Sequence, residues 1–159
     1  MRCFTLNLII AVIWLLFSSQ PGVATFFIGF ALGTGLIALF QPVLPRERYL
    51  GRVLGALRFV AVFLREFVLA NIDLLRTVLF LPKEKLHPNL ITVDVRGLTK
   101  PEILLLTHCI SLTPGSVSVH IEEDFHTLLV HALSGRDPDA VRRQIHDTFV
   151  RAILGFSRK

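Results

Sequence analysis

Apolar and polar positions change their spacing along this chain, and the first pattern predicts a membrane region. Residues 3–45 contain no Asp, Glu, Lys or Arg, and their apolar residues form two runs, 4–17 and 24–40, separated by Ser-Ser-Gln-Pro-Gly. A hydrocarbon slab about 30 Å thick would accept these runs, whereas water would penalise them. The pattern predicts a transmembrane helical hairpin over residues 1–45. A removable signal peptide is less well supported, because no small-x-small site precedes Pro21 and a second apolar run follows at once.

The second apolar run contains small residues at a helical spacing. Gly29 and Gly33 are four residues apart, and the cluster Gly33-Thr34-Gly35 adds a third glycine. In lipid, such a stripe lets another helix approach closely, so Gly29 and Gly33 are candidates for contact with a partner helix. The alternative is that glycine is simply frequent in membrane helices.

Residues 53–81 are mostly apolar, yet their charged side chains share one side of a helix. At 100° per residue these positions fall within an arc of roughly 100°. They are Arg58, Arg65, Glu66, Asp73 and Arg76. The region 46–82 is then a basic loop followed by an amphipathic helix that lies in the bilayer surface. The alternative is a third spanning helix whose charged side packs against a partner subunit. The five residues are candidates for subunit contact, and Asp73 and Arg76 have the spacing of a helical ion pair.

From residue 83 the spacing predicts a small α+β domain that extends to residue 159. Residues 91–96 alternate as a strand does, and Thr99 and Glu102 form a capping box that opens a helix. The turn Thr113-Pro114-Gly115 ends this helix. Strands at 116–121 and 127–133 follow, and Asp137 caps a final helix. The order is β-α-β-β-α, which corresponds to one sheet with helices on one face.

Two apolar patterns in this domain predict which residues face the core. Along the strand 116–121, Val117, Val119 and Ile121 alternate and are expected on one face. Along the final helix, apolar residues recur every four positions, at Val141, Ile145, Phe149 and Ile153.

Charge is uneven along the chain, and it predicts an orientation. The net charge is +5, the first 81 residues carry seven Arg against three acids, and the rest of the chain carries ten basic and nine acidic residues. Arg2 precedes the hairpin, and Arg46, Arg48 and Arg52 follow it, after a helix stop at 41–45. The positive-inside rule places these residues, and the C-terminal domain with them, in the cytoplasm. Anionic membrane lipid is therefore an expected partner. The sequence has no basic patch with interleaved aromatic residues, so we do not expect nucleic acid as a partner.

The sequence contains no common catalytic or nucleotide-binding motif, so we predict no enzymatic activity and no cofactor. His120, His126 and His131 lie on or near neighbouring predicted strands, but strand histidines are more often ordinary sheet residues than zinc ligands. His108 and Cys109 are adjacent on a helix and point about 100° apart, which argues against an activated thiol. Asn7 is the only strongly polar residue within the two apolar runs of the hairpin. If ions are moved, another subunit holds the ionisable groups.

Three segments resemble a known membrane family. The first is Ile110-Ser111-Leu112-Thr113-Pro114-Gly115-Ser116, where the family pattern is close to Ser-Ile-Thr-Leu-Thr-Pro-Gly-Thr. The others are residues 69–76, Leu-Ala-Asn-Ile-Asp-Leu-Leu-Arg, and residues 129–133, Leu-Val-His-Ala-Leu. Together they resemble the E subunit of the multisubunit monovalent cation/proton antiporters, the Mrp, Mnh or Pha systems. One departure is His108-Cys109, where the family often has Asn-Ser.

The resemblance implies a small accessory subunit of an assembly that exchanges Na⁺ or K⁺ for H⁺ across a bacterial cell membrane. Its expected partners are the other antiporter subunits, of which the large ones resemble ion translocators. No catalytic residue transfers to this chain, whereas Thr113, Pro114 and Gly115 transfer as a structural or contact element. A membrane-anchored module that recruits a cytosolic partner is the alternative.

Overall fold

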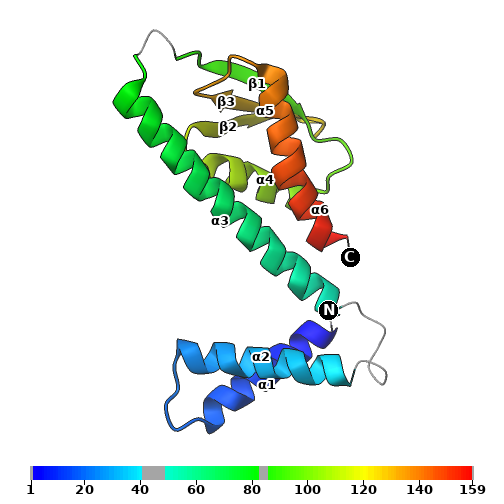
Figure 1. Cartoon of the computed structure of the whole chain (residues 1–159). Coiled ribbons are helices and arrows are strands. Elements are labelled where there is room, and N and C mark those ends of the chain that lie inside the picture. Colours follow the sequence, from blue (N-terminus) through cyan, green and yellow to red (C-terminus); the bar gives the residue numbers. More distant parts are fainter. Residues whose placement is uncertain (1, 41–48, 83–85, 159) are drawn as a thin grey trace. The chain divides into compact units, whose positions relative to one another are not determined.

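The computed structural model describes residues 2–40, 49–82 and 86–158, which divide into two compact units, Met1–Leu54 and Gly55–Lys159. The expected helix stop at 41–45 and the basic positions Arg46 and Arg48 lie outside the described residues. The elements, labelled in Figure 1 except for η2, are α1 (Arg2–Phe17), α2 (Val23–Leu39), α3 (Tyr49–Phe80), β1 (Asn89–Asp94), α4 (Lys100–Leu112), β2 (Ser116–Ile121), β3 (Thr127–Ala132), α5 (Pro138–Ile145), the π-helical turn η2 (His146–Val150) and α6 (Arg151–Ser157).

In the first unit, α1 and α2 form a helical hairpin that packs through small and polar residues. Gly29 and Gly33 of α2 are buried against α1, where a side chain on either glycine would collide with Trp14 or Asn7. Asn7 is fully buried, and its Nδ2 donates to Thr34 Oγ1 over 2.9 Å. Most other side chains of the hairpin point outward. Within the described parts of the chain, none of the helices is both long and apolar enough to cross a membrane.

The second unit contains a three-stranded antiparallel sheet in the order β1-β3-β2. The predicted β-α-β-β-α order is confirmed in this unit. Helix α4 begins with the predicted capping box, in which the Thr99 amide donates to Glu102 Oε2 over 2.7 Å. The Asp137 carboxylate caps α5 by accepting from the amides of Asp139 and Ala140. In both helices a proline stands in the first turn, where its missing amide hydrogen costs nothing.

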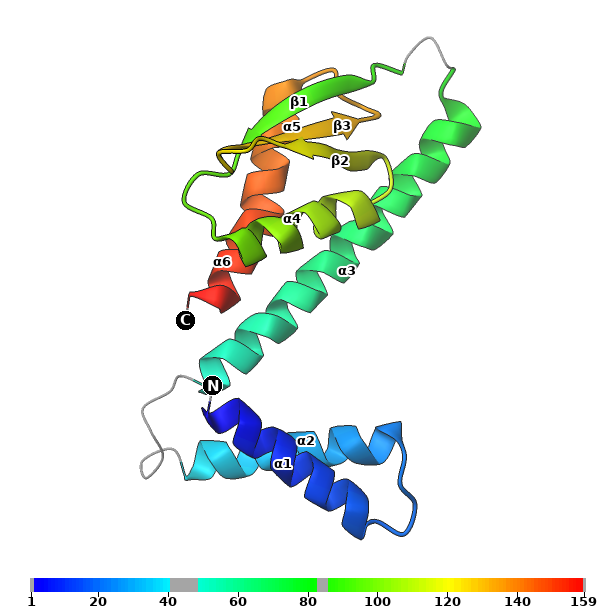
Figure 2. The ribbon, with the colours of Figure 1, turned by 180° about the vertical axis from the view of Figure 1, so that it is seen from behind.

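One face of the sheet carries the core, and α4 and the α5–α6 segment cover it (Figure 2). Its fully buried side chains include Leu106 of α4, Leu128 and Val130 of β3, and Ile153 of α6. Apolar burial of this kind is the main favourable term in folding. Phe59 and Phe63 of α3 and Phe156 of α6 pack on the same core, and the rings of Phe59 and Phe156 lie 5.4 Å apart.

The expected common face of Val117, Val119 and Ile121 is wrong for Ile121. The register between β2 and β3 shifts between Ser118 and His120, which is a β-bulge. An extra residue inverts the alternation that follows it. Val117 and Val119 are therefore exposed, whereas Ile121 packs against the core.

The final helical segment differs from a regular α-helix in its middle. The π-helical turn η2 separates α5 from α6. Four residues turn an α-helix by roughly 400°, so apolar residues spaced by four drift by about 40° at each step. A wider turn offsets this drift. It keeps Ile145, Phe149 and Ile153 together in the core.

Candidate subunit-contact surface

A cleft of about 300 Å³ in the second unit brings together five of the predicted contact residues. Glu66 and Asp73 line it from α3, and Thr113, Pro114 and Gly115 line it from the turn between α4 and β2. These two segments are about forty residues apart in sequence, and the family resemblance includes the turn and Asp73 but not Glu66. The remaining walls come from α3, β3 and the start of the final helical segment, through Leu69, Ala70, Leu74, Thr77, Ser116, Ala132, Leu133, Ser134, Val141, Gln144 and Phe149.

The turn that forms one wall is held by hydrogen bonds to the end of α4. Thr113 Oγ1 donates to the Cys109 carbonyl over 2.7 Å, and Ser116 Oγ donates to the Ile110 carbonyl over 3.0 Å. These bonds satisfy carbonyl groups that the helix end leaves without an intrahelical partner. Gly115 has φ +91°, a left-handed conformation that glycine adopts without steric cost. The turn therefore presents a fixed shape to the cleft.

The two carboxylates of the cleft differ in their exposure. The Glu66 side chain is 12% exposed, and its Oε1 lies 2.7 Å from Nη1 of Arg65. The Asp73 side chain is 76% exposed, and its Oδ1 lies 3.9 Å from Nη1 of Arg76. The predicted Asp73–Arg76 ion pair is thus present, and it is long and exposed to solvent. Glu66 provides a sheltered negative charge and Asp73 a solvated one.

The arginines of the predicted charged side do not line the cleft. Arg58, Arg65 and Arg76 are exposed on α3. The opposite side of α3 carries a broad exposed apolar surface, which includes Leu57, Val60, Leu64, Val68, Leu75 and Val78. A helix with an apolar face and a flanking row of basic residues is typical of membrane-surface helices.

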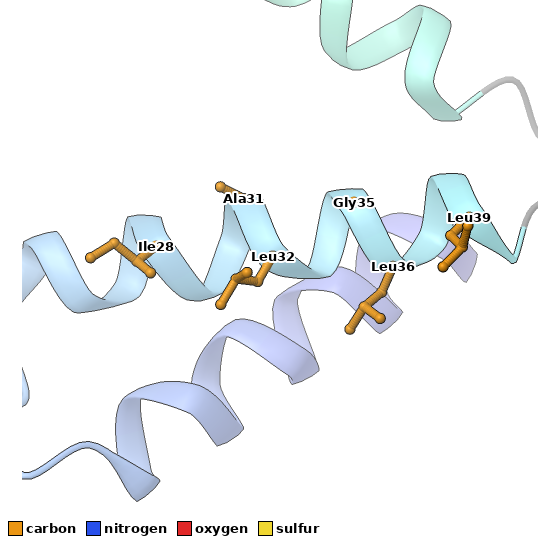
Figure 3. Close-up of a pocket in the computed structure, with 6 residues that line it drawn as sticks. All are labelled: Ile28, Ala31, Leu32, Gly35, Leu36 and Leu39. Carbon is orange, nitrogen blue, oxygen red and sulfur yellow. The ribbon is translucent and has the colours of Figure 1, made fainter.

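Gly29 and Gly33 lie in the other unit, and their close partner is α1 of the same chain. The close helix approach that their spacing predicts is therefore made inside the hairpin. Gly35 differs from both, because nothing lies within 4 Å of the position where its side chain would be. It belongs to an apolar hollow on the outer face of α2 that Ile28, Ala31, Leu32, Leu36 and Leu39 also line (Figure 3).

Outside the cleft, a buried carboxylate links α4 to α6. Glu102 is 6% exposed and accepts from Ser157 Oγ over 2.6 Å and from Arg158 Nη2 over 3.0 Å. The Arg158 guanidinium, more than any other group, holds the pKa of Glu102 well below its usual range. Arg158 also donates to the Gly97 carbonyl, so one guanidinium connects the end of α6 to the loop before α4.

Among the described residues, neither the strand histidines nor the adjacent residues His108 and Cys109 form a reactive arrangement. His108 is exposed, whereas Cys109 is buried, and burial raises the pKa of the Cys109 thiol to about 11. His120 and His131 lie on adjacent strands, but they are not opposite each other, since His120 pairs with Leu129 and His131 with Val117. In the part of the chain that the structure describes, no three metal-ligating side chains converge.

Comparison with known proteins identifies the family of this chain. The model of the family described as Na⁺/H⁺ ion antiporter subunit (MNHE) matches residues 7–155. The chain belongs to this Na⁺/H⁺ antiporter subunit family. The match covers the hairpin, α3 and the α+β domain together, so the predicted resemblance to the E subunit is confirmed.

Two relatives and one solved structure illustrate the similarity of this family member. The chain is 36% identical to the E subunit of the Na(+)/H(+) antiporter of Alkalihalophilus pseudofirmus over 94% of each chain. It is 31% identical to the corresponding E subunit of Bacillus subtilis over 96% of each chain. A chain of the membrane-bound sulfane sulfur reductase, an archaeal respiratory membrane complex, is 18% identical with a TM-score of 0.52, and the match covers 86% of this chain and 85% of that one. This last similarity concerns the fold alone.

Several residues that line the cleft of this family member were not predicted from the sequence as contact residues. Thr77 falls on the same side of α3 as Glu66, so helical spacing could have found it. Ser116 directly follows the family-like turn and could have been added to it. No sequence pattern indicates that Gln144 and Phe149 line the cleft, because only the tertiary fold brings the final helical segment beside α3.

Proposed function

We propose that this chain is an accessory subunit of a multisubunit monovalent cation/proton antiporter, and that it supports assembly rather than carrying the ion path. The family match over residues 7–155 carries the proposal. Relatives that match nearly their whole length are named as E subunits of Na(+)/H(+) antiporters. The partners of this chain are then other antiporter subunits, and it acts in transport and not as an enzyme.

The position of the ion path follows from the residue types of the hairpin. Residues 3–45 contain no Asp, Glu, Lys or Arg. Helices that conduct ions or relay protons carry such groups, or histidine, at membrane depth. Asn7 is the strongly polar residue inside the hairpin, and its amide binds Thr34 within the chain. The ion path therefore lies in other subunits, and the hairpin serves as an anchor.

The membrane arrangement is part of the same proposal. The hairpin α1–α2 spans the bilayer, supported by outward-facing apolar side chains such as Leu16 at 76% and Leu39 at 73% exposure. Helices of 16 and 17 residues are roughly 25 Å long, so the bilayer is thinned locally around them. Helix α3 lies in the membrane surface through its apolar side, with the arginines beside the headgroups. The positive-inside rule places the α+β domain in the cytoplasm.

The cleft is the proposed contact site for a neighbouring subunit. It joins the α3 residues Glu66 and Asp73 to the turn Thr113-Pro114-Gly115, and the family resemblance includes Asp73 and the turn. The arginines Arg58, Arg65 and Arg76 are proposed to contact lipid headgroups or subunits beside the cleft. Gly29 and Gly33 support the hairpin itself.

Co-purification tests the proposal. A tagged chain expressed with the other subunits should retain the large subunits after detergent extraction, and deletion of residues 90–159 should abolish this retention. In complexes that still assemble, variants of this chain should leave the apparent affinity for Na⁺ or K⁺ unchanged, because the ion path lies elsewhere. A tagged chain that purifies without other subunits would contradict the proposal. A reporter fused after Lys159 should be active only in its cytoplasmic form.

A further inference from the structure

The ionisable groups that line the cleft all have the same sign. Of its sixteen lining residues, Glu66 and Asp73 carry negative charge, and the others are neutral. Their ion-pair partners, Arg65 and Arg76, are not lining residues, and their side chains are 71% and 73% exposed. The cleft thus has one sheltered carboxylate, Glu66, and one solvated carboxylate, Asp73, and no cationic side chain among its lining residues.

The hydroxyl groups of the cleft add acceptors to these carboxylates. The hydrogens of Thr113 and Ser116 are directed at the carbonyl groups of Cys109 and Ile110. Each hydroxyl oxygen keeps lone pairs for a ligand, because its hydrogen is already used. The polar lining formed by these four side chains therefore suits a ligand rich in hydrogen-bond donors.

Size and apolar lining narrow the class of ligand further. A volume of about 300 Å³ is at the lower end for ligand pockets. It suits one long side chain with its neighbours and excludes a folded domain. Leu69, Leu74 and Phe149 supply apolar surface against which the methylene groups of Arg or Lys can pack.

The existing ion pairs do not prevent such a ligand from binding. Arg65 and Glu66 are adjacent in sequence, so their pairing joins no other element to α3. Arg65 binds Oε1 of Glu66, and a carboxylate accepts hydrogen bonds at both of its oxygens, so a cation in the cleft can bind this carboxylate as well. Its attraction to a carboxylate that is 12% exposed is screened less than that of a surface pair.

We infer that the cleft between α3 and the Thr113-Pro114-Gly115 turn binds a cationic segment of a partner subunit, with an Arg or Lys side chain directed at Glu66 and Asp73. This inference rests on the proposed function, since it requires a partner subunit. It names the chemistry of the contact, which is a basic side chain with an apolar stem inserted among acceptors.

Salt dependence of the assembled complex tests the inference. The complex is bound through a tag on this chain and washed with increasing NaCl, for the wild type and for E66Q, D73N and the double variant E66Q/D73N. The double variant should release the partner at a salt concentration roughly threefold lower than the wild type, because two attractive charges are lost. The matched control is D147N, since Asp147 is an exposed carboxylate outside the cleft. It should behave as the wild type does.

A crosslinking measurement identifies the occupant directly. A photoreactive phenylalanine at Ser134, an exposed residue that lines the cleft, should form an adduct with a partner peptide that contains Arg or Lys. D73N changes an exposed position, so this variant keeps the test valid if E66Q lowers the folded yield.

The outcomes separate the inference from the proposed function. A wild-type chain that retains no antiporter subunits overturns both. A wild-type chain that retains them with the same salt profile as E66Q/D73N overturns the inference alone. Adducts that map only to lipid, or to a partner segment without a basic residue, overturn it as well.

Discussion

The hairpin and the α+β domain place their apolar side chains in opposite ways. In the domain, Leu106 and Leu128 are 0% exposed and most charged residues lie on the surface. In the hairpin, Leu16 and Leu39 are 76% and 73% exposed, and the fully buried positions include the polar Asn7. The same chain therefore follows two packing rules. The domain hides leucine from water, whereas the hairpin uses glycine and asparagine to bring its two helices together.

This difference means that the energy of each unit has a different origin. Burial of apolar area stabilises the domain, at roughly 25 cal/mol per Å². In the proposed membrane arrangement the hairpin helices meet in lipid, where this driving force is missing and close packing and interhelical hydrogen bonds replace it. Substitutions that test one rule should therefore leave the other unit unaffected. Trp14 is the single tryptophan of the chain and packs on Gly29, so its fluorescence reports the hairpin, while the sheet signal in circular dichroism reports the domain.

The largest effect is expected for Leu106→Ala. This side chain is 0% exposed in the domain core, and its removal should destabilise the domain by about 3 kcal/mol through lost burial and a cavity. Denaturant unfolding of the full chain in detergent, followed by circular dichroism, measures this. Leu16→Ala in the hairpin is the matched control and should change the stability of either unit by less than about 0.5 kcal/mol. Equal losses in both variants would contradict the comparison.

Gly33→Leu should produce the next largest effect, and this effect should appear in the hairpin. A Cβ at residue 33 would lie 2.0 Å from Asn7 Oδ1, so either Asn7 must turn away from Thr34 or the helices must separate. We expect a loss of about 2 kcal/mol, seen as a lower midpoint in Trp14 fluorescence. Gly35→Leu makes the same change where nothing lies within 4 Å, and it should leave the midpoint unchanged. If both variants lower the midpoint alike, helix propensity and not close packing is responsible.

Glu102→Gln should cost about 1–2 kcal/mol in the domain at neutral pH, because it removes a charged acceptor of several hydrogen bonds. The folded state lowers the pKa of Glu102 below the ordinary value of 4.5, so its stabilisation is fully present above that pH. It is lost as the pH falls toward the lowered pKa. The stabilities of wild type and variant should therefore converge at acid pH, in thermal unfolding measured from pH 7 to pH 3. A difference that stays constant over this range would contradict the role of the charge.

Thr34→Val should give the smallest effect, about 0.6 kcal/mol in the hairpin. The substitution keeps the shape of the side chain and removes the hydroxyl that accepts from Asn7. Trp14 fluorescence during thermal unfolding measures it. Thr25→Val, which removes a hydroxyl bonded only to the Gln20 carbonyl in the turn, is the control and should have a smaller effect on the midpoint.

Much of the fold could be predicted because local signals agree with it. The capping box at Thr99 and Glu102, the Asp137 cap and the alternating strands each depend on residues within one turn or strand. The β-bulge after Ser118 could not be predicted, because it depends on pairing with β3. The link from Glu102 to Arg158 was also missed, since 56 residues separate the two and sequence shows only the capping role of Glu102.

The candidate site was predicted in pieces and not as a whole. Spacing grouped Glu66 and Asp73 on one side of a helix, and the family resemblance singled out Thr113-Pro114-Gly115. Their meeting in one cleft is a tertiary result, which no pattern within either segment contains. The stripe of Gly29 and Gly33 shows the converse, because its spacing predicts a close helix and cannot tell α1 from a helix of another subunit.

The strand order β1-β3-β2 has a consequence for synthesis of the chain. The central strand β3 is the last of the three to leave the ribosome, so β1 and β2 both wait for it with unpaired edges. Chains are made from the N-terminus, and hairpin residues as close as Asn7 and Thr34 can meet long before residue 132 is made. In the proposed membrane arrangement, the nascent chain reaches the membrane before its sheet can close, and unpaired edges are prone to wrong pairing during this interval.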